Sequence, residues 1–298
     1  MTPCNKSMIA AALQLLLLVG IMLGAGELGA QEKNFLWKVH SEPHNLYILG
    51  SIHVLKKENY PLKKIIEETF DGTNKLVLEI DLRSAKPELV EQLAIRKGMN
   101  TDGTALHQKV SKETYEMLTK RTKELGFDVG MLRPFKPWVV AMTMVAMKLQ
   151  KLGFDPNLGV DRYLAERAKR VDKPTVGLET AEFQIGLFDQ LSARDQERLL
   201  RQSMSDMDHL EENVDEIVQS WKTGDIDGVE KLLLAGMRDY PEIHQKVIDE
   251  RNRRWVPQIE NFLSGGEKAL VVVGAAHLVG KNGVIELLKG RGYRVEQQ

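Results

Sequence analysis

Cysteine is almost absent from this chain, because Cys4 is the one cysteine among 298 residues. It precedes an apolar run that we expect to be removed on secretion, so the mature chain is expected to contain none. This excludes disulfides, zinc sites built from thiolates and a cysteine nucleophile. A chain of this length can rely on its hydrophobic core rather than on disulfides for stability.

An excess of charge of one sign is also lacking. Lys and Arg together number 41 and Asp and Glu 42, which gives a formal net charge of −1 at pH 7. This balance indicates no nucleic-acid partner. The motifs HExxH, GxSxG and the Walker A pattern do not occur in the sequence. Their absence argues against the familiar zinc peptidase, serine hydrolase and P-loop templates.

The first 30 residues differ in composition from the remainder. Lys6 gives a weakly positive start, Met8 to Leu23 is apolar except for Gln14, and small residues follow up to Ala30. This pattern predicts a secretory signal that is cleaved after Ala30. The alternative is an uncleaved N-terminal membrane anchor, because the apolar run of about 16 residues is slightly long for a signal, although it is also slightly short for a membrane span. In both cases we expect residues 31–298 to form a single domain outside the cytoplasm, periplasmic or secreted.

Two stretches far apart in the chain share one pattern. NLYILGSIHV contains Gly50 and His53, and ALVVVGAAHL contains Gly274 and His277. Each apolar run is long enough for a buried strand. A glycine at a strand end permits a turn or a close backbone approach that a side chain would block. A bare Gly-x-x-His pattern is weak, but the shared context predicts that both histidines follow strand ends.

A carboxylate occupies a comparable position in a third apolar run. Lys75–Ile80 (KLVLEI) is a predicted strand with Glu79 near its end. If the three strands are parallel neighbours, then His53, His277 and Glu79 converge at one edge of the sheet. Two imidazoles and one carboxylate form a metal site of the catalytic type, suited to Zn, Mn, Fe or Co. The structural alternative is that each histidine caps a strand end or bonds a backbone group.

Three further residues are candidates for the same site. Glu179 follows the predicted strand PTVGL and is either a proton carrier or an outer partner of the site, with helix capping as the structural alternative. Arg251 and Asn252 lie in DERNRRW, within a long charged helix, and both are candidates for binding the substrate. Arg251 could hold a substrate carboxylate or an oxyanion, and the structural alternative is a solvated helix face.

The order of predicted elements indicates an α/β fold. Predicted strands lie at both ends of the chain, with a large and mostly helical block between them. We therefore expect a mixed sheet built from N- and C-terminal strands, with the helical block as a lid or wall. The predicted elements include a hairpin of residues 35–40 and 46–49, a helix opening at Tyr60-Pro61, a Met-rich helix at Trp138–Leu152, and a helix at Glu242–Leu263 that is broken or kinked near Pro257.

The ordered set of segments resembles the TraB/PrgY/GumN family. The resemblance is carried by FLWKVHSEPHNLYILGSIHVL, LVLEIDL, VGLETAEFQIGLFDQLS, DERNRRW and VVVGAAHLVGKNGVIELLKGRGYRV, and it runs from about Phe35 to Val295. The animal Tiki metalloproteases belong to the same superfamily. The resemblance implies a fold similar to that of erythromycin esterase and of the haem-binding ChaN proteins.

The resemblance also implies roles for individual residues. Tiki-type members are regarded as metal-dependent proteases that use two Gly-x-x-His motifs and one Glu. These correspond here to Gly50, His53, Glu79, Gly274 and His277. Pheromone-shutdown members suggest peptides as ligands, and the name GumN comes from exopolysaccharide gene clusters.

Three functions remain open from the sequence. The first is a divalent-metal-dependent hydrolase, a peptidase acting on a peptide or protein, with His53, Glu79 and His277 on the metal and Glu79 or Glu179 moving the proton. The second is a metal-independent hydrolase that uses the same histidines and glutamate on an ester. The third is a binding protein for a peptide, haem or a polysaccharide-assembly partner, in which Met142 and Met144 line the groove.

Overall fold

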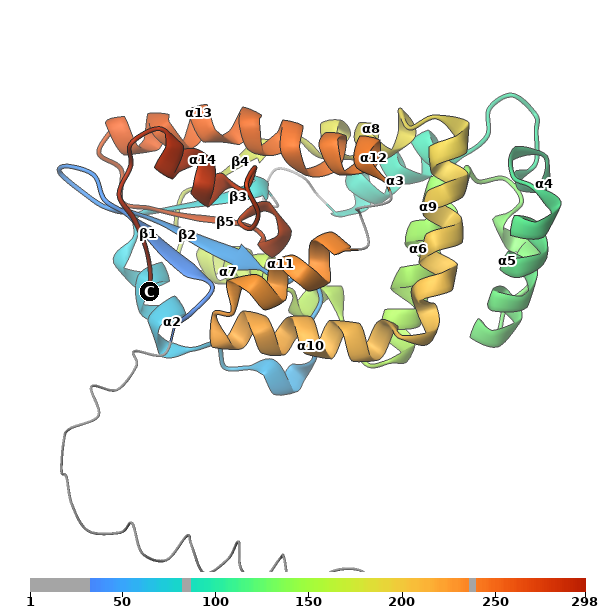
Figure 1. Ribbon diagram of the computed structural model, residues 1–298, viewed down its shortest axis with the longest axis horizontal. Coiled ribbons are helices and arrows are strands. Elements are labelled where there is room, and N and C mark those ends of the chain that lie inside the picture. The colour runs from blue at the N-terminus through green and yellow to red at the C-terminus, as the bar shows by residue number, and fades with distance from the viewer. Residues whose placement is uncertain (1–32, 82–86, 236–239) are drawn as a thin grey trace, which may run out of the picture. The chain divides into compact units, whose positions relative to one another are not determined.

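The sheet joins strands from both ends of the chain. In the computed structural model, which describes residues 33–81, 87–235 and 240–298, six strands pair in the order β4-β3-β5-β2-β1-β6 (Figure 1). They are β1 (Leu36–Val39), β2 (Leu46–Ser51), β3 (Lys75–Ile80), β4 (Thr175–Glu179), β5 (Ala269–Gly274) and β6 (Val295–Gln297). The predicted α/β class with a mixed sheet from both chain ends is confirmed. The expected signal segment, residues 1–30, lies outside the described residues.

The central strand of the sheet comes from the C-terminal part of the chain. β5 lies between β2 and β3 and runs parallel to both, with Ser51 opposite Gly274 and Leu78 opposite Val272. β4 is parallel to β3, whereas β1 is antiparallel to β2 and β6. Every residue of β5 is buried, as expected for a strand with two neighbours and helices on both faces. The carboxyl ends of β2, β3, β4 and β5 therefore meet at one edge.

Helices cover both faces of the sheet. Figure 1 shows α13 and α14 above it and α2, α7 and α10 below it. The helices are α2 (Lys64–Gly72), α3 (Pro87–Gly98), α4 (Leu106–Lys109), α5 (Lys112–Leu125), α6 (Pro137–Lys151), α7 (Val160–Arg170), α8 (Ala181–Asp189), α9 (Ala193–Ser205), α10 (Leu210–Thr223), α11 (Ile226–Ala235), α12 (Pro241–His244), α13 (Glu250–Ser264) and α14 (Val284–Gly290).

The ends of α5 follow local sequence signals. Ser111 accepts a hydrogen bond from the Thr114 N–H and so caps the start of α5, and Gly126 ends that helix at φ 92°.

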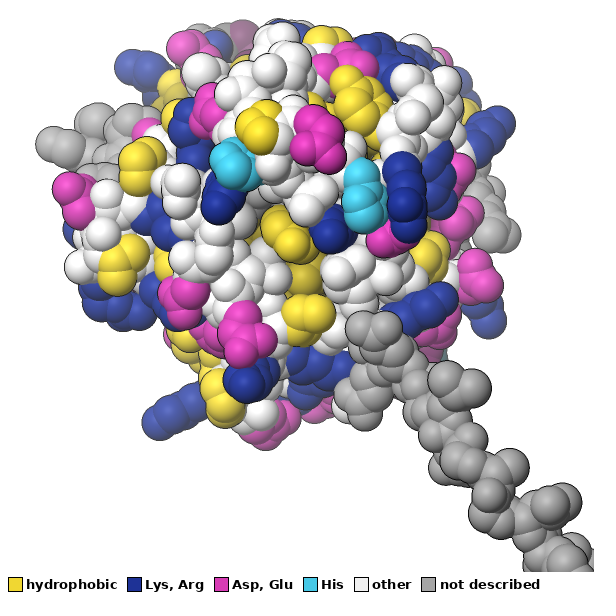
Figure 2. Space-filling model, turned by 90° about the vertical axis from the view of Figure 1, so that its left-hand side faces the viewer, with side chains coloured by type: hydrophobic (Ala, Val, Ile, Leu, Met, Phe, Trp, Pro, Cys, Tyr) yellow, Lys and Arg dark blue, Asp and Glu magenta, His cyan; other side chains and the backbone are white. Residues whose placement is uncertain are grey.

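The surface carries charges of both signs. On the side that lies at the left of Figure 1, Lys and Arg side chains are interspersed with Asp and Glu (Figure 2). This mixture agrees with the formal net charge of −1. Among the described residues, no helix is both long enough and apolar enough to cross a membrane.

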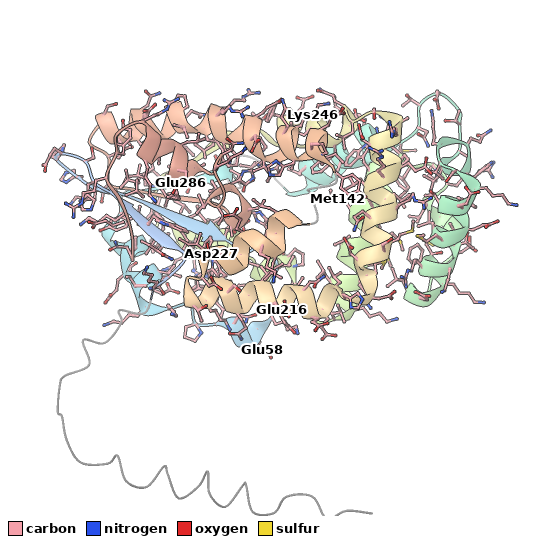
Figure 3. All side chains as sticks on the ribbon, viewed as in Figure 1. Glu58, Met142, Glu216, Asp227, Lys246 and Glu286 are labelled. Carbon is pink, nitrogen blue, oxygen red and sulfur yellow. The ribbon has the colours of Figure 1, made fainter. Side chains whose placement is uncertain are left out.

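The Met-rich helix α6 belongs to a second, helical core. Met144 is fully buried and packs in one cluster with Leu118 of α5 and Leu200 of α9. Met142 lies on the same helix and is 40% exposed (Figure 3). Neither methionine is among the residues that line the cavity at the sheet edge. Packing between helices therefore accounts for Met144, and the predicted groove role of these methionines has no support from their positions.

Two proline predictions were wrong. α2 begins at Lys64 rather than at Pro61, because Lys63 is still extended at φ −57° and ψ 140°. α13 continues through Pro257 without a break. Pro257 has no N–H to donate to the carbonyl of Arg253. Both residues lie on the exposed face of the helix, so water can bond that carbonyl instead. The irregular part of the predicted long helix is instead a π-helical turn, η5 (Gln245–Asp249).

Candidate functional site

The three predicted metal ligands lie around one glycine at the edge of the sheet. His53 follows β2, Glu79 is near the end of β3, and His277 ends η6 (Ala275–His277), the short turn after β5. A Cβ atom placed on Gly274 would lie 2.9 Å from His53 Nε2, 3.2 Å from Glu79 Oε1 and 3.6 Å from His277 Cδ2. The structure therefore brings these residues together across more than 220 positions of sequence.

The two predicted glycines provide space for different groups. A Cβ on Gly50 would lie 2.3 Å from the ring of Phe35, so this glycine lets the core approach β2. Gly274 instead leaves room for the polar groups of the site, and its N–H donates to Glu79 Oε1 at 2.6 Å. Its backbone, at φ −52° and ψ 137°, is accessible to any residue. The space that it leaves, and not its conformation, is what requires a glycine here.

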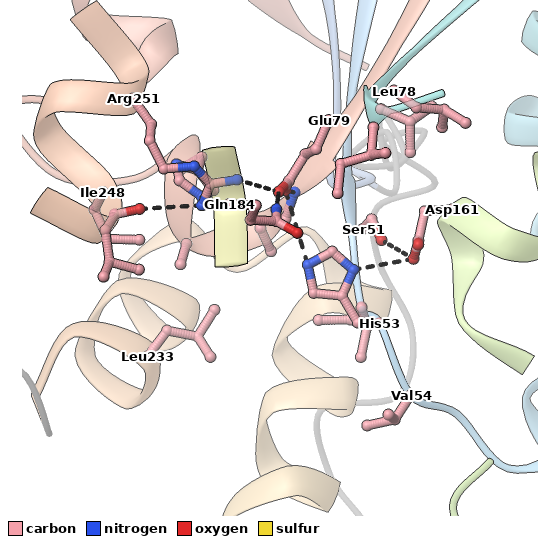
Figure 4. Close-up of a pocket in the computed structure, with 18 of the residues that line it drawn as sticks. Ser51, His53, Val54, Leu78, Glu79, Asp161, Gln184, Leu233, Ile248 and Arg251 are labelled. Carbon is pink, nitrogen blue, oxygen red and sulfur yellow. Dashed lines mark hydrogen bonds and ion pairs between the residues drawn. The ribbon is translucent and has the colours of Figure 1, made fainter. Parts of the chain in front are cut away.

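His53 is held by a carboxylate from the first turn of α7. Its Nδ1 lies 3.1 Å from Asp161 Oδ1, which also accepts a bond of 2.7 Å from Ser51 Oγ. Its Nε2 lies 3.8 Å from Glu79 Oε1 (Figure 4). The enclosing walls disfavour a charged ring, but the nearby carboxylates of Asp161 and Glu79 outweigh this and raise the pKa of His53 to about 9. At neutral pH the ring is therefore a cation.

His277 is in the opposite state. Its side chain is buried, and its Nε2 lies 2.9 Å from Arg251 Nη1. A guanidinium can only donate, so Nε2 accepts, and Nδ1–H donates to Asn252 Oδ1 at 2.7 Å. Burial and the neighbouring guanidinium lower the pKa of His277 to about 3, although Glu79 opposes them. His277 is therefore neutral, with the lone pair of Nε2 directed into the site.

The carboxylate of Glu79 accepts hydrogen bonds from several neighbouring groups. The Glu79 side chain is 10% exposed. Oε1 accepts from the Gly274 N–H, and Oε2 accepts from Gln184 Nε2 at 3.0 Å and from Arg251 Nη2. Burial disfavours its charge, but the adjacent imidazoles, the guanidinium and the Gly274 N–H outweigh this and hold its pKa well below the ordinary value. Glu79 is therefore an ionised carboxylate at neutral pH.

Arg251, for which we predicted substrate contacts, binds protein groups in this structure. Nε donates to Glu179 Oε1 at 3.0 Å, Nη2 donates to Glu79 and Glu179, and Nη1 donates to the Val247 carbonyl at 3.1 Å and to His277. A guanidinium has five N–H donors, and these contacts use its three nitrogens. Its geometry supports a role in positioning the carboxylates and His277.

Glu179 and Asn252 also lie behind the reacting groups. Glu179 accepts from Arg251, from Trp255 Nε1 at 3.1 Å and from Gln184 Nε2 at 3.2 Å, and it is not among the described residues that line the cavity. Glu179 was predicted to be either a proton carrier or an outer partner of the site, and these contacts favour the role of outer partner. Asn252 is fully buried and bonds His277, where we had predicted contact with substrate.

Four residues of the site were missed from the sequence. Asp161 lies in the first turn of a predicted helix, where an acidic residue is usual and gives no functional signal. Gly159 allows α7 to approach, because a Cβ there would lie 2.3 Å from the His53 carbonyl oxygen. Gln184 and Trp255 appear in the sequence as ordinary helix residues. Their partners come from β3 and β4, which no local pattern identifies.

His53, Glu79 and His277 are suitable ligand types for a divalent metal. The guanidinium of Arg251, however, competes with a metal for the lone pair of His277. Both histidines present Nε2 to the site while Asp161 and Asn252 hold Nδ1, which is the usual arrangement of metal-bound imidazole. Among the described residues, no three His, Cys, Asp or Glu side chains are close enough to hold an ion as they stand. Arg251 lies against the lone pair of His277. Metal binding would therefore require Arg251 Nη1 to withdraw.

A cavity of about 560 Å³ opens beside these groups. His53 is 56% exposed because it faces this space. Figure 4 shows Arg251 and Asp161 on opposite sides of His53, with Ile248 and Leu233 on the Arg251 side of the cavity and Val54 below His53 in this view. Such a volume is typical of small-molecule and peptide-side-chain pockets.

Comparison with known proteins places the chain in a family. The sequence model of the TraB/PrgY/gumN family matches residues 35–297. The chain is similar to the uncharacterized protein YbaP of Escherichia coli (strain K12), at 24% identity over 82% of this chain and 88% of that protein. An uncharacterized protein of Treponema pallidum (strain Nichols) is 23% identical over 58% of this chain and 51% of that protein. No solved structure matches the chain. The extent of the family match, over nearly all the described residues, shows that the chain belongs to the TraB/PrgY/gumN family.

Proposed function

We propose that this protein is a divalent-metal-dependent hydrolase of amide bonds, a peptidase, with His53, Glu79 and His277 as the metal ligands. One observation carries the proposal: two imidazole rings and a carboxylate from three parallel strands converge beside Gly274. Mn, Co, Zn and Fe are all compatible with two nitrogens and one oxygen. When bound, such an ion polarises a carbonyl and lowers the pKa of water.

The remaining residues of the site orient these groups. Asp161 fixes the ring of His53 through Nδ1, and Asn252 fixes that of His277 in the same way. Arg251 holds Glu79 and keeps a positive charge beside the developing oxyanion. Of the two carboxylates predicted to move the proton, Glu79 is the one that lines the cavity, and it would take a proton from water and return it to the leaving amine.

The charges of the site also favour a divalent cation. Glu79, Glu179 and Asp161 are three carboxylates within one network of hydrogen bonds and ion pairs, and Arg251 and protonated His53 supply two positive charges. With all three acids ionised, this leaves one excess negative charge. If a divalent ion replaces the proton of His53, the group becomes neutral. A buried group gains most from such compensation, because uncompensated charge is costly at low dielectric.

The test is metal content and chelation. We expect the purified full chain to bind about one divalent ion by mass spectrometry of its metals, and to cleave denatured protein substrates. Both properties should be lost in His53→Ala and His277→Ala and kept in His209→Ala, an exposed histidine at the start of α10. Chelation should abolish cleavage, and added metal should restore it. A chain that neither binds metal nor cleaves would contradict the proposal.

A metal-free hydrolase is a second candidate, and the contact between Arg251 and His277 favours it. Arg251 already supplies a cation at His277 Nε2, 2.9 Å away, and His53 carries a proton beside Asp161. On an ester, the ionised Glu79 would then take a proton from the attacking water, His53 would donate a proton to the leaving group, and the positive charge of Arg251 would stabilise the oxyanion. Full activity after exhaustive chelation, together with its loss in His53→Gln, would select this mechanism over the first.

We also propose that residues 31–298 act outside the cytoplasm, in the periplasm or after secretion. The apolar run from Met8 to Leu23, followed by small residues up to Ala30, supports this. N-terminal sequencing of the protein from fractionated cells is the test. A mature chain that begins at Gln31 would agree with signal cleavage, whereas an intact Met1 in the membrane fraction would show an anchor.

A further inference from the structure

The cavity is lined by two chemically different sets of residues. His53, Glu79, Arg251 and Asp161 form a polar set at the strand ends. The second set, here called the apolar wall, consists of aliphatic and aromatic groups from helices: Phe188 of α8, Val214 and Ile217 of α10, Leu233 of α11, and Val247 and Ile248 of η5. A peptide carbonyl placed beside the polar set would therefore have apolar groups within reach of a neighbouring side chain.

The apolar wall is an uncovered continuation of the hydrophobic core. On α10, Val218 and Trp221 are buried beneath the sheet, whereas Val214 and Ile217, one turn earlier, are only half-buried and face the cavity. Helical residues three to four positions apart share a face, so one stripe passes from the core into the cavity.

α11 repeats the arrangement. Val229 is fully buried in the core, and Leu233, four residues later, is half-buried at the cavity. Two helices thus direct aliphatic groups into one space. Apolar surface exposed in a concave site is favourable to cover, which is the usual basis of side-chain recognition in a pocket.

The guanidinium in the cavity wall is held by protein groups. In this structure Arg251 donates to Glu79, Glu179, His277 and the Val247 carbonyl, and these contacts use all five of its N–H donors. The described wall thus offers apolar contact where a site for acidic groups would offer a free guanidinium.

We propose that the substrate of this site is a peptide with a bulky, uncharged aliphatic or aromatic side chain next to the bond that is cleaved. The apolar wall of Val214, Ile217, Leu233 and Ile248 binds that side chain. This inference rests on the proposed hydrolase function, since it places the scissile carbonyl at His53. The cavity volume of about 560 Å³ has room for such a side chain together with the adjoining backbone.

The test compares two neighbouring leucines of α11. Leu233 lines the cavity, whereas Leu232 lies beside Glu212 and Asp215 in a different surface depression. The metal-supplemented full chain is incubated with a mixed peptide library, and the cleaved bonds are identified by mass spectrometry. We expect Leu, Ile, Val, Met or Phe to exceed charged residues by about tenfold or more at one position flanking the cleaved bond, the discrimination that apolar pockets typically give.

The variants provide a specific signature. Leu233→Asp should reduce kcat/KM for apolar peptides by about tenfold or more and shift the preference toward Lys or Arg, because it places a carboxylate in the wall. Leu233→Ala should weaken the apolar preference without this shift, which covers the case in which the Asp variant does not fold. Leu232→Asp should keep the parent specificity. Cleavage without apolar preference, or equal behaviour of the variants at 232 and 233, would overturn the inference.

A binding measurement separates this inference from the hydrolase proposal. An apolar fluorescent dye is bound to the chain and displaced by a Leu- and Phe-containing peptide amide, in the parent chain and in both variants. Displacement that is lost in Leu233→Asp but kept in Leu232→Asp supports the apolar wall even when no peptide is cleaved, and only the hydrolase proposal then fails. Absence of both cleavage and displacement would contradict both.

Discussion

The two histidines of the site differ in the protonation state that their surroundings favour. His53 faces the carboxylates of Asp161 and Glu79, whereas His277 is enclosed beside the guanidinium of Arg251. The pKa of the first is raised to about 9, and that of the second is lowered to about 3. A metal would therefore have to displace a proton from His53 and none from His277.

Removing the charge of Asp161 tests this difference directly. In the metal-free protein, Asp161→Asn should lower the pKa of His53 from about 9 toward its ordinary value of 6.5, because the carboxylate bonded to the ring no longer carries a charge. NMR titration of the imidazole protons measures it. Asp155→Asn makes the same change at a residue that caps the short turn η3 (Pro156–Leu158), and should leave His53 unaltered. An unchanged pKa in Asp161→Asn would show that another group holds the proton.

Adding one methyl group at Gly274 tests whether the site needs the space there. Gly274→Ala should reduce metal affinity by about tenfold or more, since its Cβ would lie 2.9 Å from His53 Nε2. The fold should remain, because the backbone conformation suits alanine. Calorimetric titration with Mn²⁺ or Zn²⁺ measures the affinity. Gly72→Ala is the control, as nothing lies within 4 Å of a Cβ at that position. Unaltered affinity in Gly274→Ala would place the ion elsewhere.

At the scale of single residues, the sequence predicts the site residues that directly follow a strand. It does not identify residues of other elements that pack against the strand ends. His53, Glu79 and His277 each end an apolar run, and parallel strands bring such ends together. Asp161 reaches His53 only because α7 packs against the end of β2. The ionic partners of Arg251 likewise depend on which strand ends face α13, and no local pattern contains that information.

At the scale of elements, one hydrogen bond connects α10 to the strand that carries His53. Trp221 Nε1 donates to the Gly50 carbonyl at 2.7 Å in a buried setting. Trp221→Phe should lower the free energy of unfolding by about 1 to 3 kcal/mol, because the carbonyl keeps no equivalent donor. Denaturant unfolding measures the change.

Trp138 provides a matched control for that prediction. It is also buried, but its Nε1 has no acceptor among the described residues. Trp138→Phe should therefore cost less than Trp221→Phe, since it removes an unsatisfied donor. Equal losses in the two variants would mean that ring volume, and not the bond to Gly50, determines the effect.

The sequence predicted the type of each element better than its interruptions. The 75–80 strand and the hairpin were expected from apolar runs and turn residues, and the structure has both. Proline was a poor guide within the long C-terminal helix. Pro257 is tolerated on the exposed face of α13, whereas the π-helical turn at residues 245–249 has no proline and no sequence signal. Ile248 of that turn lines the cavity, so an irregularity that the sequence does not signal contributes to the site.

At the scale of the whole molecule, the order of apolar runs along the chain predicts the strands of the sheet, but it does not predict which helices pack against that sheet. The parallel placement of β2, β3 and β5 follows from three apolar runs that end in polar residues. The division of the helices between the sheet core and a separate cluster of α5, α6 and α9 does not. Amphipathic helices of similar composition can cover either core, and which one they cover depends on connections that the periodicity does not show.

The free energy of unfolding depends on pH through several residues of the site, and their titrations act in opposite directions. His277 is protonated in the unfolded chain below its ordinary pKa of 6.5 but in the fold only near 3, so stability is lost as pH falls from 6.5 toward 3. Glu79, with its lowered pKa, acts in the same direction below 4.5. His53 acts oppositely: its contribution is complete below pH 6.5 and is lost as pH rises through about 9.

The metal-free protein should therefore be most stable near pH 6.5, as measured by denaturant unfolding across pH 4 to 9. His277→Asn should flatten the acid side of the curve and His53→Asn the alkaline side, because each removes one of the two titrations. His209→Asn, at a ring that is largely exposed, should leave both sides in place. A stability that continued to rise up to pH 9 would mean that His53 is not held as a cation, and the charge balance proposed for the metal would then lose its basis.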